Sequence, residues 1–196
     1  MPYVRSWMVM MSMCLVFTDA FATHMKGGEL TYEDLGGGQY LIRLVVYRDC
    51  GSNNANGTGF DVVAPIGIFN SSGQLINSIS IPLSIDNIEE IAYLTADTCT
   101  AIPASLCIQQ ATYEQQVELG VYAGGLTMSY QRCCRTPALV NLMAPDDTGV
   151  TLTATIPGTD MATINSSPAF TAPPVVAMCL GQPFAMNQSA TDQDGD

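Results

Sequence analysis

The stretch Tyr130-Gln131-Arg132-Cys133-Cys134-Arg135 (YQRCCR) decides how we interpret the fold of this chain. It follows residues 126–129 (LTMS), which have the composition of a β-strand. Side chains alternate between the two faces of a strand, so Cys133 and Cys134 should point in opposite directions. Adjacent cysteines with diverging Cβ vectors rarely bridge each other. We therefore expect each of them to pair with a distant cysteine.

A similar segment, Tyr47-Arg48-Asp49-Cys50, closes the apolar run 41–46 earlier in the chain. We interpret the two segments as strand ends in an oxidised β domain. Their arginines, Arg48, Arg132 and Arg135, are expected to pair with carboxylates such as Asp49 and so to serve a structural role. Binding of a polyanion is the alternative.

The first 22 residues have the three parts of a secretory signal peptide. Arg5 supplies the positive charge, and residues 7–17 (WMVMMSMCLVF) are apolar but too short to span a bilayer. Residues 20–22 (AFA) have the pattern of a cleavage site. We predict an exported protein that is either associated with the cell surface or outer membrane, or extracellular. No transmembrane segment is expected after residue 22.

Export and cysteine content together predict disulfide bonds. Cleavage removes Cys14 and leaves six of the seven cysteines, in a compartment where disulfides persist. The candidates are Cys50, Cys99, Cys107, Cys133, Cys134 and Cys179. We expect Cys99 to pair with Cys107, and Cys50 to pair with one of the two adjacent cysteines. The sequence alone does not choose among the connectivities.

The chain is strongly acidic, with a formal net charge of −12. The signal peptide contains one basic and one acidic residue, so its removal leaves this charge unchanged. Nucleic acids and anionic lipids require a basic surface and are therefore not expected as partners. The acidity favours solubility, and the binding of divalent cations is the alternative.

Turn signals divide residues 23–157 into about eight short strand-like runs, which predicts an all-β, Ig-like sandwich. The expected strands are residues 29–33, 39–47, 62–69, 75–83, 111–122, 126–134 and 150–156. Residues 34–38 should form a glycine-rich hairpin loop. Residues 85–94 are compatible with a helix that has Asp86 as its N-cap, or with a strand.

The composition changes after residue 157. Residues 158–174 are rich in proline and small polar residues, which predicts a linker. We interpret residues 175–196 as the start of a second β domain. Within it, Asp192, Asp194 and Asp196 form an acidic turn with Gly195. Because Ca²⁺ needs several oxygen ligands and a loop that can curl around it, this turn predicts a calcium site. A solvated acidic turn is the alternative.

Several segments occur along this chain in one order. They are 22–32 (ATHMKGGELTY), 38–40 (GQY), 47–50 (YRDC), 130–135 (YQRCCR) and 165–168 (NSSP). This ordered set resembles the N-terminal region of large Bacteroidetes surface proteins that carry Ig-like or PKD-like repeats and end in a gliding-motility-associated C-terminal domain. The resemblance implies type IX secretion, and a cadherin- or PKD-like type for the second domain. It assigns no functional residues to this region.

The sequence lacks the parts of a common hydrolase site, and we expect no enzyme. The sole histidine, His24, lies near the predicted mature terminus, whereas Ser-His-Asp and Cys-His sites need a histidine in the fold. The carboxylates of Asp61, Glu114 and Glu118 show no spacing that predicts a glycosidase pair.

The predicted function is adhesion, or the spacing and presentation of other domains, in a modular surface or secreted protein. Its partner would be an extracellular protein or polysaccharide. The alternative is a carbohydrate- or polymer-binding module attached to a downstream hydrolase. Tyr93, Tyr113 and Tyr122 would then have to supply the aromatic faces on which sugars stack.

Overall fold

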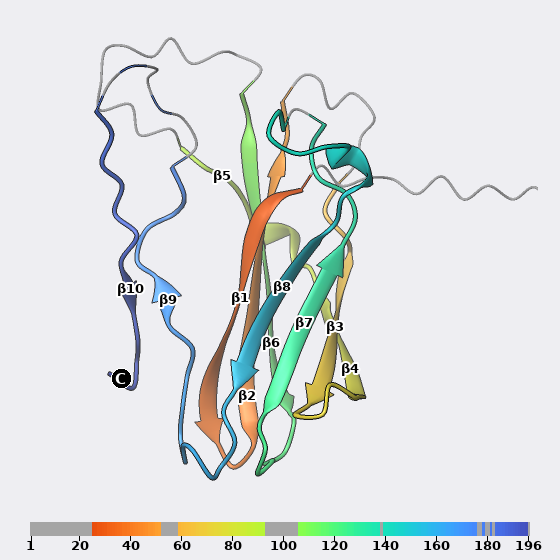
Figure 1. The fold of residues 1–196 in the computed structure, drawn as a ribbon, viewed down its shortest axis with the longest axis vertical. Coiled ribbons are helices and arrows are strands. Elements are labelled where there is room, and N and C mark those ends of the chain that lie inside the picture. Colours follow the sequence, from red (N-terminus) through yellow and green to blue (C-terminus); the bar gives the residue numbers. More distant parts are fainter. Residues whose placement is uncertain are drawn as a thin grey trace, which may run out of the picture.

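The computed structural model describes residues 25–51, 59–92, 106–137, 139–175, 178, 181 and 183–195. Within these residues, eight strands form a sandwich of two antiparallel sheets (Figure 1), which confirms the predicted all-β, Ig-like fold. The predicted signal peptide lies outside the described residues.

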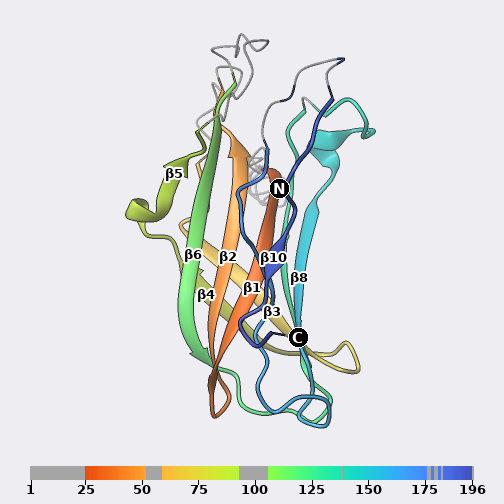
Figure 2. The same cartoon turned by 90° about the vertical axis from the view of Figure 1, so that its left-hand side faces the viewer.

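Each sheet of the sandwich has four strands, and every neighbouring pair is antiparallel. The first sheet contains, in spatial order, β1 (Met25–Gly36), β2 (Gln39–Asp49), β6 (Ile108–Glu118) and β5 (Ile88–Glu90). The second contains β4 (Leu75–Pro82), β3 (Val63–Asn70), β7 (Leu126–Arg132) and β8 (Val150–Ile156). Two short strands, β9 (Ala169–Phe170) and β10 (Ala190–Thr191), pair with each other beside β1 (Figures 1 and 2).

One hydrophobic core lies between the two sheets, because alternate side chains of each strand point inward. Its largest fully buried side chains are Met25, Ile42, Leu44, Ile66, Ile68, Ile81, Tyr113, Met128 and Tyr130. Burial of one such aliphatic side chain stabilises the fold by about 1.5–3 kcal/mol. The core therefore holds the two sheets together.

The predicted hairpin between β1 and β2 is confirmed, but its loop is shorter than residues 34–38, because β1 continues to Gly36, which pairs with Gln39. Gly36, Gly37 and Gly38 have φ angles of 85°, 64° and 82°. Residues with a side chain rarely adopt these angles, which explains why three glycines occur together here.

Two predicted elements differ from the structure. Residues Ile85–Asn87 form a single 3-10 turn, and the chain then continues as β5, where Ile88 is paired with Ala111. The N-cap position is Ser84 and not Asp86, and its side chain makes no capping hydrogen bond. Pairing with β6 thus determines the conformation here, and the weak helical preference does not. The strand predicted to end at residue 122 ends at Glu118.

The edge strand β1 is covered at both ends by other parts of the chain. At its start, Met25 donates its N–H to the carbonyl of Cys134 (3.1 Å) and accepts from the N–H of Thr136 (3.3 Å). Toward its other end, Ser167 donates its N–H to the carbonyl of Tyr32 (2.9 Å). Residues 165–167, within the predicted linker, therefore lie against the first sheet. The division into two domains stays a prediction.

Candidate functional site

The Cys50–Cys107 disulfide joins the end of β2 to the start of β6. In this ladder Asp49 lies opposite Ile108, so the next pair along is Cys50 and Cys107. Their Cα atoms are 4.8 Å apart, and Cys50 donates its N–H to the Cys107 carbonyl (2.9 Å). The predicted pairs of Cys107 with Cys99, and of Cys50 with Cys133 or Cys134, are therefore wrong.

Cys133 and Cys134 form a disulfide with each other, so the prediction of distant partners is wrong. The prediction assumed that a strand continues through both residues. β7 ends at Arg132, and the peptide bond between the cysteines is cis, with their Cα atoms 3.1 Å apart. The alternation of a strand therefore does not apply to them. The remaining candidates, Cys99 and Cys179, lie outside the described residues.

Arg132 pairs with a carboxylate, as predicted, but its partner is Asp61. The Nη2 atom of Arg132 lies 2.8 Å from Oδ1 of Asp61. Tyr113 donates its hydroxyl to the Asp61 carbonyl (2.8 Å), and Tyr130 donates to Oδ2 (3.4 Å). Burial raises the pKa of both tyrosines. This cluster joins β6, β7 and the segment before β3.

Arg48 and Arg135 also have structural contacts. Arg48 donates to Oε1 of Gln109 through Nε (3.1 Å) and Nη2 (2.7 Å), and its guanidinium carbon lies 4.8 Å from the ring centroid of Phe60. Arg135 donates through Nε to the Gly149 carbonyl (3.4 Å). The partners in these contacts are an amide, an aromatic ring and a backbone carbonyl, and the predicted pairing of Arg48 and Arg135 with carboxylates stays a prediction.

A groove of about 510 Å³ lies between the start of β1 and the segment that follows β8. Lys26, Gly27, Gly28, Glu29, Tyr47 and Ile108 form one side of it. The opposite side has an apolar surface from Phe170, Pro173, Pro174, Val175 and Met186. Ile108 is on the outer face of its sheet, yet it is only 4% exposed. The segment on the opposite side of the groove therefore shields this part of the sheet from solvent.

Two polar pairs lie along the sheet side of the groove. Tyr47 donates its hydroxyl to the carboxylate of Glu29. Burial raises the pKa of Glu29, although this hydrogen bond and the charge of Arg43 act in the opposite direction. Burial and the neighbouring Glu29 raise the pKa of Tyr47 to about 12. Lys26 forms an ion pair with Asp49 at 3.0 Å.

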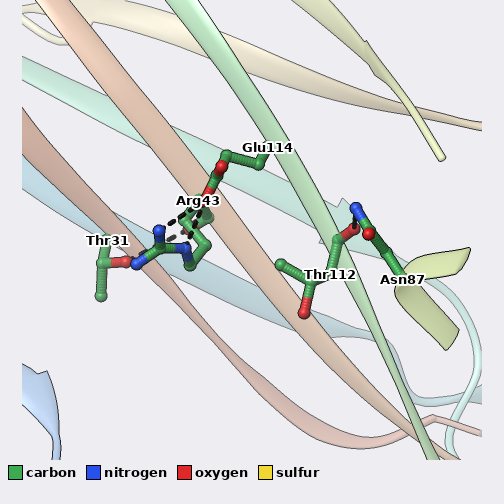
Figure 3. A network of polar contacts seen from close by, with 5 residues as sticks. All are labelled: Thr31, Arg43, Asn87, Thr112 and Glu114. Atoms are coloured by element: carbon green, nitrogen blue, oxygen red, sulfur yellow. Dashed lines mark hydrogen bonds and ion pairs between the residues drawn. The ribbon is translucent and has the colours of Figure 1, made fainter. Parts of the chain in front are cut away.

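Farther along the same outer face, the side chains are polar and paired across strands (Figure 3). Arg43 of β2 forms an ion pair with Glu114 of β6 at 2.5 Å, and Thr31 of β1 donates to the Arg43 carbonyl (3.4 Å). Both partners of the ion pair are more than one-third exposed, so solvent screens it and it adds little stability. This surface contrasts with the apolar wall of the groove.

The acidic turn contacts the segment that covers β1. Asp194 donates its N–H to Oδ1 of Asp192 (2.9 Å), and its own Oδ2 accepts from the N–H of Ser166. Asp196 lies outside the described residues. Within the described part of the chain, no three His, Cys, Asp or Glu side chains are grouped so as to hold a metal ion. The calcium site stays a prediction.

The other sequence candidates do not converge on one site. Asp61 and Glu114 are in the ion pairs described above, and Glu118 is exposed at the end of β6. Tyr113 is 1% exposed and cannot stack on a sugar, whereas Tyr122 is exposed at 41%. His24 and Tyr93 lie outside the described residues.

Sequence reasoning did not find the groove. One available signal was the Gly27-Gly28 pair, because glycine within a strand marks a place where another backbone or a ligand approaches closely. The second signal was Pro173-Pro174, which has no N–H groups to extend a sheet and so marks a segment that runs beside a strand without pairing.

No family model, curated protein or solved structure matches this chain. The helices in the described part of the chain are single 3-10 turns, and none is long and apolar enough to span a membrane.

Proposed function

We propose that this chain is a non-catalytic binding module of an exported, modular protein that acts in adhesion or in the presentation of other domains. The observation that carries the proposal is the groove between β1 and residues 170–175. It combines an apolar wall with a floor that contains a hydrogen-bonded carboxylate and an ion pair. Concave sites of this kind, apolar with a few polar groups, are typical of ligand-binding sites.

The disulfides support the exported location, because such bonds persist in oxidising compartments. Some of the segments that carry the resemblance to gliding-motility-associated surface proteins are also neighbours in the fold. Segment 22–32 includes most of β1, Cys134 of segment 130–135 bonds the start of this strand, and Ser167 of segment 165–168 bonds it farther along. Three segments that carry the resemblance therefore meet at the strand that lines the groove. Type IX secretion and surface display remain part of the proposal.

A carbohydrate is the second candidate ligand, because two aromatic side chains, Tyr47 and Phe170, line the groove. Aromatic faces are where sugars stack.

The test fills the groove. A Cβ built on Gly27 has no atom within 4 Å, so Gly27→Trp places an indole in the groove without displacing the backbone. Gly59→Trp is the matched control, since a Cβ at Gly59 also meets open space and this residue does not line the groove. The labelled protein is applied to a glycan array and to a displayed library of random peptides. We expect probes that bind the wild-type chain and the control and lose at least about tenfold in affinity with Gly27→Trp. The proposal fails if no probe shows this difference.

A further inference from the structure

We propose that the groove takes an extended polypeptide, which adds as a strand to the edge of β1 at Gly28 and Leu30. This inference rests on the proposed binding function and names the chemical class of the ligand. A partner added to a sheet edge in this way is held by main-chain hydrogen bonds, while its alternate side chains contact the surfaces on either side.

The hydrogen-bond register identifies the groups that are available on β1. In an antiparallel ladder, alternate residues of an edge strand direct their N–H and C=O groups away from the neighbouring strand. Tyr32 is such a residue, because its N–H and C=O bond Ser167 and not β2. Leu30 and Gly28 lie two and four positions earlier in the same unbroken register. Their main-chain groups therefore also point outward, and they have no hydrogen-bond partner within the described residues.

The chain itself already pairs with this edge on both sides of the open positions. The Oγ atom of Ser167 accepts from the N–H of Tyr32 (2.8 Å), and the Oγ atom of Ser166 accepts from the N–H of Asp34 (3.2 Å). Cys134 and Thr136 bond the main chain of Met25 at the other end. Gly28 and Leu30 thus form a gap in an edge that is otherwise paired.

The covering segment leaves β1 before it reaches this gap. Main-chain groups alternate in direction along an extended segment, so after Ser167 the next residue that could bond β1 is Ala169. The chain then pairs with β10 through Ala169 and Phe170 and continues to Pro173 and Pro174 in the far wall of the groove. Figures 1 and 2 show this segment running beside β1. A strand placed in the gap would lie between β1 and this wall at Gly28, which lines the groove, and would continue past Leu30, which does not line it.

The glycines make the edge accessible to another backbone. Gly27 carries no side chain to block the groove, and a Cβ on Gly28 would press against the Val45 carbonyl and lie 2.8 Å from Cδ1 of Leu152. A side chain at either position would therefore fill the groove or disturb the sandwich. The wall opposite has Phe170, Val175 and Met186, which favours apolar side chains at alternate positions of the bound peptide.

An extended peptide fits these groups better than a glycan. Gly28 and Leu30 each present one N–H donor and one C=O acceptor, repeated at the two-residue spacing of a strand. A second strand carries the complementary groups at the same spacing, whereas sugar hydroxyls have no such repeat.

The experiment begins with a displayed library of random nine-residue peptides, selected on the intact chain with Gly27→Trp as the competitor. The selected peptide is synthesised, and its main-chain amides are N-methylated singly along the sequence. We expect methylation at alternate positions to weaken binding at least tenfold, and methylation at the positions between to have little effect. Binding should also slow hydrogen exchange at the amides of Gly28 and Leu30 at least tenfold, while Gly59→Trp binds as the wild-type chain does.

Other outcomes overturn the inference. One is that no selected peptide is excluded by Gly27→Trp, and another is that methylation shows no alternation or that the amides of Gly28 and Leu30 stay unprotected. If a glycan from the array is the only probe that Gly27→Trp excludes, the strand inference fails and the proposed binding function stands. If no peptide and no glycan is excluded, both fail.

Discussion

The Cys50–Cys107 disulfide should supply a large part of the stability of this sandwich. The perturbation is replacement of both cysteines by alanine. The matched control is the same replacement of Cys133 and Cys134. The two bonds differ in the length of chain that each closes, because the sequence separations are 57 residues and 1 residue.

The magnitude follows from the entropy that a cross-link removes from the unfolded chain. For a closed loop of this length the loss is about 14 cal/mol/K, equivalent to about 4 kcal/mol at 25 °C. For a chain of this size, such a change lowers the midpoint of thermal unfolding by roughly 10 °C. The bond between adjacent cysteines closes almost no chain, so its removal should cost far less.

Urea unfolding without reductant, followed by circular dichroism, measures the free energy of unfolding of both variants. We expect a loss of about 4 kcal/mol for the Cys50 and Cys107 variant and less than about 1 kcal/mol for the control. Equal losses, or a loss below about 1 kcal/mol for the long loop, would show that loop closure is not the source of stability.

Three further predictions concern single side chains. The raised pKa of Glu29 means that this carboxyl binds its proton more tightly in the folded chain than in the unfolded chain. The free energy of unfolding should therefore fall as pH rises above the ordinary pKa of 4.5. Urea titrations between about pH 4 and pH 7 should show a smaller fall for Glu29→Gln. Tyr32→Phe removes the hydroxyl that bonds the Thr155 carbonyl (3.1 Å) and Oδ1 of Asn165. We expect the free energy of unfolding, measured in urea, to fall by about 1 kcal/mol, and hydrogen exchange in residues 165–167 to become faster. Arg132→Ala leaves the half-buried Asp61 without its ion-pair partner and should lower the free energy of unfolding in urea by about 1–3 kcal/mol. Arg43→Ala, which removes an exposed ion pair, is the control. An equal loss in both variants would contradict a structural role for the Arg132 cluster.

The fold could be predicted because its signals are local. Alternation in residues 150–156 gives the exact span of β8, and the three glycines between β1 and β2 require a turn. The weakest prediction was for residues 85–94, where short-range preferences are balanced and pairing with β6 decides the outcome.

The disulfides and the groove depend on contacts between distant residues. Cys50 pairs with Cys107 because β2 and β6 are neighbours, and this neighbourhood is a property of the whole topology. Alternation misled the prediction for Cys133 and Cys134, since nothing in the local sequence indicates that β7 ends at Arg132. The groove needs residues from β1 and from 170–175 at once, so neither segment predicts it alone.

The bond between Cys50 and Cys107 also has a mechanical consequence for the proposed role in adhesion. Under tension, a folded domain lengthens by unravelling, and each released residue adds about 3.4 Å of contour. While the disulfide remains oxidised, the residues between the two cysteines, a sequence separation of 57, cannot extend, and roughly 190 Å of contour length is not released. The chain would therefore transmit load as a short tether, and a reductant would convert it into a longer and more compliant one.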